Sequence, residues 1–146
     1  MAKYSPAINQ LINQLASLPG IGQKTAQRLA FHILAIPKEK AEALAHSILE
    51  AKNLTRFCSR CCNLTDRDPC EICSDEKRDN QIICVVENPS DVAAMERTRG
   101  YNGRYHVLHG AISPMNNIGP EDMRLKELLA RLHQENEVTE VILANN

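Results

Sequence analysis

Five of the six cysteines lie within one stretch of seventeen residues, FCSRCCNLTDRDPCEIC. Two pairs of them have a two-residue spacer, and eight residues separate the pairs. A two-residue spacer lets both thiolates of one turn point at the same ion, and two such turns supply the tetrahedral sulfur cage that zinc accepts. The predicted ligands are Cys58, Cys61, Cys70 and Cys73. We therefore predict one structural zinc ion per chain, with an iron–sulfur cluster or a redox pair as the alternatives.

The other two cysteines are not expected to bind this ion. Cys62 follows Cys61 directly, so its side chain should point away from the site, and Cys84 lies in an apolar run as a small buried side chain. Four thiolates close the metal shell and leave no position for a bound water, which predicts an architectural ion. The segment is too short to bury a core, whereas zinc supplies about 10–16 kcal/mol of apparent binding energy in small modules.

A second set of residues suited to chemistry lies in LPGIGQKTAQRL, between two amphipathic patterns. This stretch resembles the helix-hairpin-helix element, which binds nucleic-acid backbones without reading their sequence. Gly20 and Gly22 lack the Cβ that would block close approach, so the backbone N–H groups here, those of Gln23 and Lys24 included, can face one phosphate. Lys24 and Arg28 share a helix face and can meet an adjacent phosphate. The alternative is a tight turn used for packing or for dimerisation.

A third set consists of carboxylates. Glu87 closes the apolar run ICVVE and Asp91 follows four residues later, at the sheet edge where open α/β folds gather their sites. This layout looks like the start of a toprim domain, in which such an acid works with a later Asp-x-Asp pair to hold Mg²⁺. The Asp-x-Asp of this chain, Asp66 to Asp68, lies inside the cysteine segment. Catalysis is therefore not expected, and the alternatives are a helix cap for Asp91 and a salt bridge or interface for Glu87.

Apolar residues at helical spacing predict three helices before the cysteines. The first begins at Ser5-Pro6, a capping hydroxyl followed by proline, and ends at LPGIG. The second ends at Pro37, and the third covers about residues 38–52. Their apolar stripes imply a small helical bundle, alone or with a second copy of the chain.

Beyond residue 80 the pattern alternates between strand and helix. The expected strands are residues 83–87, 105–110 and 139–144, and the expected helices are residues 88–98 and 119–134. This alternation predicts a parallel α/β sheet. His106 and His109 flank the second strand and are weaker candidates for a pocket.

Charge and composition bound the class of protein. Residues 1–60 carry eight Lys/Arg and three Asp/Glu, whereas residues 61–146 carry nine Lys/Arg and fifteen Asp/Glu. A polyanion should therefore prefer the basic front of the chain, residues 1–60, to its acidic back, residues 61–146. No stretch approaches the roughly 20 apolar residues of a spanning helix. We therefore expect a cytoplasmic protein, in which paired thiols persist as metal ligands more readily than as disulfides.

The order of these motifs resembles that of the RecR family of bacterial recombination mediators, over essentially all 146 residues. The resemblance implies an α+β multi-module chain. Its modules are a helix-hairpin-helix bundle for DNA binding and dimerisation (1–55), a four-cysteine zinc finger (56–79) and a toprim parallel sheet, incomplete at its C-terminus (80–146). In this resemblance Tyr105 to Gly110 match the central toprim strand. RecR chains continue further, so we expect a truncated member, in which closure of the family's tetrameric ring is in doubt.

The same resemblance implies a function in DNA repair that involves no catalysis. Family members act with RecO and RecF to place RecA on single-stranded DNA, and they bind gapped DNA or single-strand/double-strand junctions without sequence preference. They form homo-oligomers, in the bacterial cytoplasm at the nucleoid. Glu87 and Asp91 match toprim acids that resemble a partner-docking surface. The competing hypothesis is a magnesium-dependent toprim nuclease or primase-like enzyme using Glu87. We also expect zinc to stiffen the junction between the basic front and the acidic back.

Overall fold

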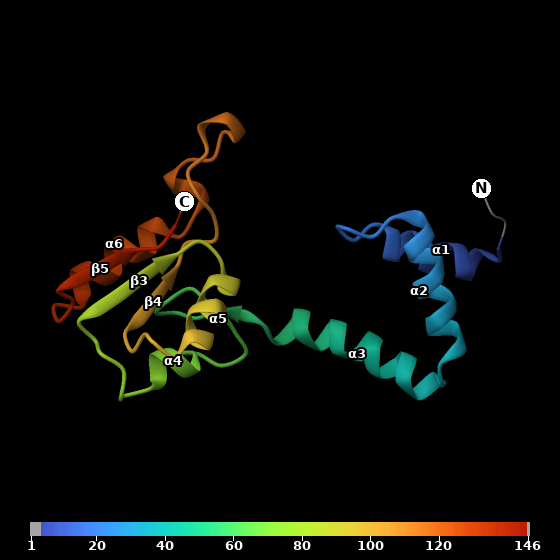
Figure 1. The fold of residues 1–146 in the computed structure, drawn as a ribbon, viewed down its shortest axis with the longest axis horizontal. Helices are drawn as coiled ribbons and strands as arrows, with labels where there is room; N and C mark the ends of the chain where they lie inside the picture. Colours follow the sequence, from blue (N-terminus) through green and yellow to red (C-terminus); the bar gives the residue numbers. More distant parts are fainter. Residues whose placement is uncertain (1–3, 146) are drawn as a thin grey trace. The chain divides into compact units, whose positions relative to one another are not determined.

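The computed structural model describes residues 4–145, and the chain divides into two compact units, Met1–Asn53 and Leu54–Asn146. Figure 1 shows helices alone in the first unit and a small sheet with helices in the second. Residues 56–79 and 80–146 therefore belong to one compact unit, while the division of the chain into three modules stays a prediction. No helix in the described range has the length and apolar character needed to cross a membrane.

The first unit contains the three expected helices. They are α1 (Pro6–Ala16), α2 (Gln23–Ala35) and α3 (Lys38–Leu54). Pro6 begins α1, where its missing N–H costs no hydrogen bond. Ser5 occupies the capping position, but its side chain makes no capping hydrogen bond, so the predicted hydroxyl cap is wrong. Ile12 of α1 is buried against Ala26 and Ala30 of α2, and the small alanines let the two helices approach closely.

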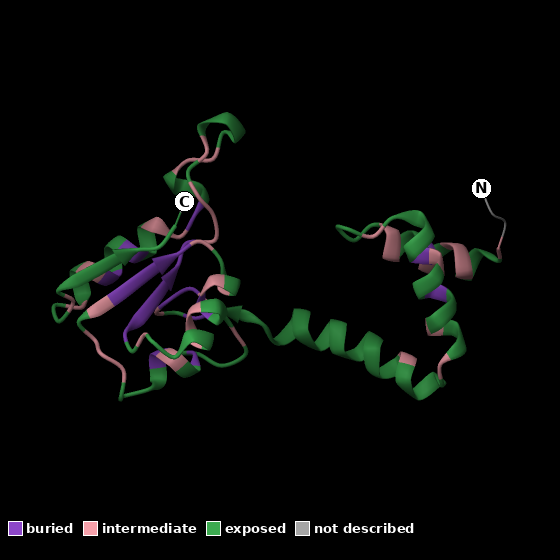
Figure 2. Cartoon of the chain, in the orientation of Figure 1, coloured by how far each residue is buried: buried purple, intermediate pink, exposed green. Residues whose placement is uncertain are grey.

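Helix α3 has the predicted apolar stripe but buries none of it. Leu44, Ile48 and Leu49 are exposed, and no residue of α3 is buried (Figure 2). The helical period is therefore confirmed, whereas the apolar face has no cover within the described chain. A helix of this pattern normally places its apolar face against another element.

The second unit combines a two-stranded hairpin with a three-stranded sheet. Its elements are β1 (Arg56–Phe57), β2 (Leu64–Thr65), α4 (Glu71–Ser74), β3 (Ile82–Val86), α5 (Pro89–Thr98), β4 (Arg104–Val107), η1 (Pro114–Asn116), η2 (Pro120–Asp122), α6 (Leu125–Gln134) and β5 (Glu140–Leu143). Strands β1 and β2 pair antiparallel, and the larger sheet has the order β4-β3-β5 with every pair parallel. The predicted α/β parallel sheet is confirmed.

Two details differ from the expectation. The helix expected over residues 119–134 begins only at Leu125, because Pro120–Asp122 form a separate 3₁₀ turn. The central strand is β3, whereas the segment that matches the family's central strand forms β4 at the edge of the described sheet.

The continuous apolar run of β3 is explained by burial on both faces. Ile83 and Val85 point to one side, where Leu128 of α6 joins their core. Cys84 and Val86 point to the other side, where α5 lies. Successive side chains of a strand alternate between faces, so a strand covered by helices on both sides is apolar throughout.

Candidate metal centre and nucleic-acid interface

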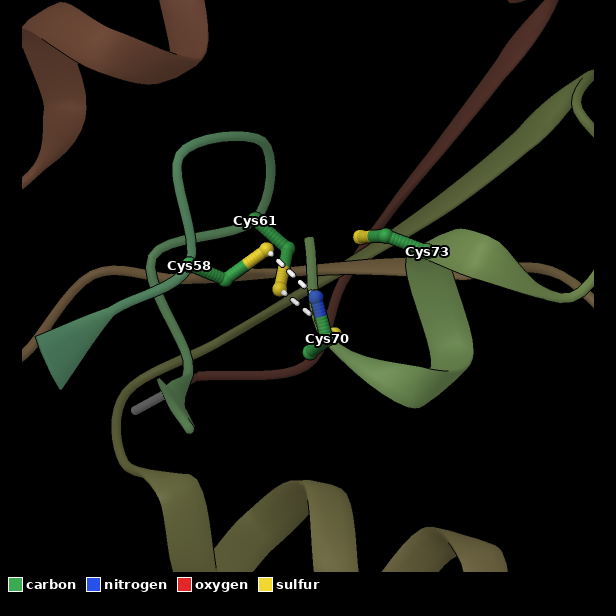
Figure 3. A group of neighbouring side chains, drawn as sticks. All are labelled: Cys58, Cys61, Cys70 and Cys73. Atoms are coloured by element: carbon green, nitrogen blue, oxygen red, sulfur yellow. Dashed lines mark hydrogen bonds between the residues drawn. The ribbon is translucent and has the colours of Figure 1, made fainter. Parts of the chain in front are cut away.

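The four paired cysteines converge on one point. Their sulfur atoms all lie within 4.8 Å of one another, and all four side chains are buried (Figure 3). The first pair lies in the turn between β1 and β2, and the second pair begins and lines the short helix α4. Within the described chain this is the one group of three or more cysteine, histidine or acidic side chains placed to hold a metal ion. The residues that converge are Cys58, Cys61, Cys70 and Cys73.

The backbone around the cluster favours negatively charged sulfur. The N–H of Cys70 donates to Cys58 Sγ at 3.3 Å, and the N–H of Asn63 donates to Cys61 Sγ at 3.5 Å. Hydrogen bonds from Cys61 and Cys73 lower the pKa of Cys70. Four soft donors in a closed, buried shell fit the tetrahedral zinc ion of structural sites.

The two remaining cysteines lie where the sequence predicts. Cys62 is buried outside the four-sulfur group, in a left-handed conformation (φ 64°) that turns the chain away after Cys61. Its carbonyl oxygen contacts Nε2 of His109, a ring that also lies against Phe57. Cys84 lies in the sheet core, and burial raises its pKa. Neither cysteine therefore belongs to the metal centre.

The cysteine segment packs directly on the parallel sheet. Ile72 of α4 contacts both the sulfur cluster and the sheet core around Tyr105. The N–H of Val107 in β4 donates to the carbonyl oxygen of Cys61 at 2.8 Å. The candidate metal centre and the sheet are therefore one packed structure.

Sequence reasoning missed the arginines that surround this centre. Arg60 donates from Nε to Glu135 Oε1 at 2.7 Å and from Nη1 to the carbonyl oxygen of Cys73 at 3.3 Å. Its hydrogen bond with Glu135 raises the pKa of Arg60. Arg104 donates to the carbonyl oxygen of Ile72. The available signals were an arginine inside a Cys-x-x-Cys turn and an arginine directly before an expected strand.

The hairpin before α2 has the geometry that a backbone-binding element requires. Gly20 has φ +80°, a conformation that other residues rarely adopt, and its turn is closed by a hydrogen bond from Ile21 N to Leu18 O at 3.2 Å. Gly22 is the N-cap of α2, and no acidic residue lies in the first turn of that helix. The first N–H groups of a helix have no partner within it, so those of Gln23 and its neighbours face outward.

The two predicted basic side chains follow this hairpin on α2. Lys24 and Arg28 are both exposed and are four residues apart on the helix. Residues at this spacing lie on the same helix face. The structure thus places two exposed cations on the helix that begins at the glycine hairpin.

The toprim acids do not assemble a metal site in the described range. Asp91 accepts a hydrogen bond from the N–H of Asn88 at 2.9 Å, at the start of α5, as the capping alternative predicts. Glu87 follows β3 and is half-buried, and its carbonyl oxygen accepts from Gly110 N at 3.3 Å. Asp68 accepts from Ser59 N inside the cysteine segment. Asp68 of the Asp-x-Asp pair therefore serves the cysteine turn.

The fold and the sites define a class of protein that joins a helix-hairpin-helix unit to a four-cysteine zinc finger and a toprim-like sheet. Family models agree: the RecR helix-hairpin-helix matches residues 8–52, the RecR four-cysteine zinc finger domain residues 55–75 and the Toprim domain residues 81–146.

Named relatives cover nearly the whole chain. Recombination protein RecR of Heliobacterium modesticaldum is 56% identical over 146 residues, which is 100% of this chain and 73% of the relative. The same protein of Moorella thermoacetica is 59% identical over 143 residues, 98% of this chain and 71% of the relative. That of Syntrophotalea carbinolica is 52% identical over 146 residues, 100% of this chain and 73% of the relative. The chain belongs to the RecR family of recombination proteins.

Proposed function

We propose that this chain is a non-enzymatic mediator of recombinational DNA repair, which binds DNA backbones and helps to load RecA on single-stranded DNA together with RecO and RecF. The observation that carries the proposal is the exposed pair Lys24 and Arg28 beside the glycine hairpin of α2. Gly20, Gly22 and Gln23 supply the backbone that approaches one phosphate, and the two cations neutralise its neighbour. Such contacts read no base, so gapped DNA or a strand junction is a suitable ligand.

The proposal assigns the three modules separate tasks. Residues 1–55 bind DNA and dimerise, residues 56–79 hold one structural zinc ion on the four paired cysteines, and residues 80–146 provide a toprim surface. Glu87 and Asp91 lie at the carboxyl end of β3, where they form an acidic docking surface for partner proteins. The setting is the bacterial cytoplasm at the nucleoid.

A single copy should bind DNA weakly, so we expect several copies to act together. Two cations per copy neutralise few phosphates, and the salt slope is about −0.9 per phosphate, so a single unit binds weakly at physiological salt. Several copies on one DNA raise the effective affinity without new contacts. The exposed apolar face of α3, with Leu44, Ile48 and Leu49, supports a homo-oligomer, a dimer or a tetramer.

The DNA contact is tested by charge removal at matched positions. Lys24→Ala combined with Arg28→Ala should weaken binding to gapped DNA. The slope of the logarithm of the binding constant against the logarithm of salt concentration should become shallower by the contribution of about two phosphates. Lys38→Ala combined with Lys40→Ala removes the same charge from the start of α3 and should have little effect. Equal salt slopes for both double variants, measured by fluorescence anisotropy, would refute the hairpin assignment.

A glycine variant tests close backbone approach on its own. An added Cβ at Gly22 meets no atom within 4 Å, and its φ of −85° suits any residue, so Gly22→Ala should fold normally. The methyl group would stand between the backbone and a phosphate, so DNA affinity should fall about tenfold with an unchanged melting temperature. Gly20→Ala, by contrast, should also lose stability because of its positive φ.

The absence of catalysis is tested directly. Labelled gapped DNA incubated with the protein and Mg²⁺ or Mn²⁺ should remain unchanged. Cleavage or synthesis that Glu87→Gln abolishes would overturn the non-enzymatic proposal.

A further inference from the structure

Arg104 is a buried cation without a carboxylate partner. The residue is only 3% exposed, and its hydrogen bonds go to neutral oxygens: Nε donates to Asn80 Oδ1 at 3.0 Å, and Nη1 donates to Ile72 O. None of the ion pairs found between residues 4 and 145 includes it. A charge taken out of water is costly unless an opposite charge lies near, and Asp75, the carboxylate that attracts Arg104, is already paired with Arg78.

Two further arginines add to this excess of positive charge. Arg60 and Arg131 share one carboxylate, with Nε to Oε distances to Glu135 of 2.7 and 3.2 Å. Arg131 is 5% exposed, and its Nη2 has no hydrogen-bond partner. Burial lowers the pKa of Arg104, and repulsion by Arg60 and Arg131 lowers it further. Two guanidinium groups thus share one carboxylate while Arg104 forms no ion pair, so positive charge is in excess here.

The side of this cluster that lacks an anion faces the cysteines. Arg60 donates to the carbonyl oxygen of Cys73, and Arg104 donates to that of Ile72, the preceding residue of α4. Attraction to the Cys73 thiolate acts on both guanidinium groups. A zinc dication bound by four thiolates carries a net charge of −2, because four negative sulfurs surround two positive charges. This charge is opposite in sign to the excess of the arginine cluster.

We propose that Arg60, Arg104 and Arg131 form a charge-balancing shell for a tetrathiolate divalent-metal centre and connect it to the parallel sheet. The proposal rests on the assignment of zinc to the four paired cysteines. Arg131 completes the connection, since its Nη1 donates to the carbonyl oxygen of Tyr105 in β4 at 2.6 Å. The shell favours the doubly negative metal–thiolate form of the cluster over four neutral thiols.

If the shell acts as proposed, the positive charge of its arginines contributes to metal affinity in addition to their hydrogen bonds. Glutamine at position 104 reaches as far as Arg104 Nε, so it can keep the hydrogen bond to Asn80 Oδ1 but carries no charge, whereas lysine keeps the charge and loses the planar fork. Second-shell changes typically cost 10–100-fold in metal affinity. We therefore expect Arg104→Gln to weaken zinc binding about tenfold, and Arg104→Lys to recover a large part of the loss. A role limited to the hydrogen bond with Asn80 would give the opposite order.

The experiment measures zinc transfer from the purified full chain to a chromogenic chelator, together with the cobalt(II)–thiolate absorption of metal-exchanged protein. Arg67→Gln is the matched control, because Arg67 is an exposed arginine of the same cysteine loop and its loss changes net charge equally. Arg60→Gln, at a side chain that is 29% exposed, provides a second variant if Arg104→Gln fails to fold. Both shell variants should transfer zinc about tenfold faster than Arg67→Gln.

The outcomes separate this inference from the proposal beneath it. Wild-type protein without stoichiometric zinc would refute the metal assignment itself. Stoichiometric zinc in the wild type, with transfer from Arg60→Gln and Arg104→Gln no faster than from Arg67→Gln, would overturn the charge-balancing shell alone. Failure of Arg104→Lys to outperform Arg104→Gln would also overturn it.

Discussion

The carbonyl oxygen of Cys61 accepts a hydrogen bond from the N–H of Val107 at 2.8 Å, which joins the first cysteine turn to the outer edge of β4. Strand β4 lies at an edge of the described sheet, yet all four of its residues are buried. An open strand edge invites pairing with other chains and is usually covered. Here the backbone of a predicted metal ligand provides the cover.

Removing the metal should therefore loosen the edge of the sheet. Chelation should speed hydrogen exchange at the Val107 amide about tenfold or more, because its acceptor belongs to a turn that the metal holds in place. The amide of Val85 in the central strand should change much less. Exchange measured by NMR with and without chelator checks this, and readdition of zinc is the control. Equal protection of Val107 in both states would contradict the coupling.

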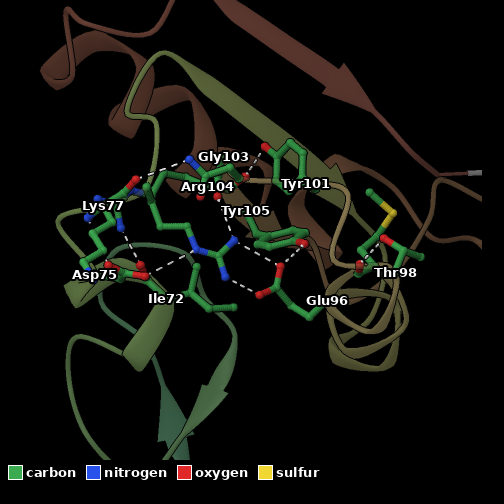
Figure 4. A network of polar contacts seen from close by, with 12 residues as sticks. Ile72, Asp75, Lys77, Glu96, Thr98, Tyr101, Gly103, Arg104 and Tyr105 are labelled. Atoms are coloured by element: carbon green, nitrogen blue, oxygen red, sulfur yellow. Dashed lines mark hydrogen bonds and ion pairs between the residues drawn. The ribbon is translucent and has the colours of Figure 1, made fainter.

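A second network joins the segment after the cysteines to the face of the sheet that α5 covers. Tyr105 Oη donates to Glu96 Oε2 at 2.6 Å, and Arg78, whose side chain is 12% exposed, forms an ion pair with the same carboxylate (Figure 4). The ion pair with Arg78 lowers the pKa of Glu96. Glu96→Gln should cost about 1–3 kcal/mol of unfolding free energy, since it removes the closer of the two carboxylates that pair with a largely buried guanidinium, the other being Asp75.

Tyr105→Phe is the milder comparison for that network. It removes one hydrogen bond but keeps the ion pair, so its expected cost is about 1 kcal/mol. Urea denaturation of both variants at saturating zinc measures the difference. A larger loss for Tyr105→Phe than for Glu96→Gln would show that the ion pair contributes little.

Regular spacing made much of this structure predictable. The two Cys-x-x-Cys turns, the glycine hairpin and the apolar runs each encode their geometry within a few neighbouring residues, and the structure places these elements as expected. Cys84 in the sheet core follows from the same local pattern. The same local reasoning failed at Pro120, because a proline near the start of a helical pattern fits a 3₁₀ turn as well as the first turn of an α-helix. The structure has the 3₁₀ turn there.

Contacts between distant residues were not predictable in this way. Arg60 and Glu135 are separated by 75 residues, and no periodicity indicates that they meet. Arg104 is the first residue of β4, and only the fold shows that it is buried beside α4 without an ion pair to a carboxylate. The covered edge of β4 likewise depends on where the cysteine segment packs. The sequence therefore did not predict which charged side chains surround the cysteine cluster.

The exposed face of α3 makes a prediction about assembly. Ile48 is 58% exposed in the single chain, in the middle of an apolar stripe with Leu44 and Leu49. If a second copy covers this stripe, Ile48→Lys should shift sedimentation from the oligomer to the monomer, because it buries a charge at the interface. Ala43→Lys places the same charge on the polar face of the helix and should leave assembly unchanged. Monomeric wild-type protein would contradict the proposal.

His106 gives the sheet a defined acid sensitivity. The ring is fully buried, its Nε2 lies 2.8 Å from the carbonyl oxygen of Arg124, and burial lowers its pKa below 6.5. Protons therefore bind the unfolded chain first, and the free energy of unfolding falls as pH drops below about 6.5, until the folded-state pKa is reached. His106→Gln keeps an N–H donor but removes this titration. Between about pH 7.5 and 5.5, at saturating zinc, wild-type stability should fall more steeply than that of the variant, by up to about 1.4 kcal/mol per pH unit. Parallel pH profiles in chemical denaturation would show that His106 is not the responsible group.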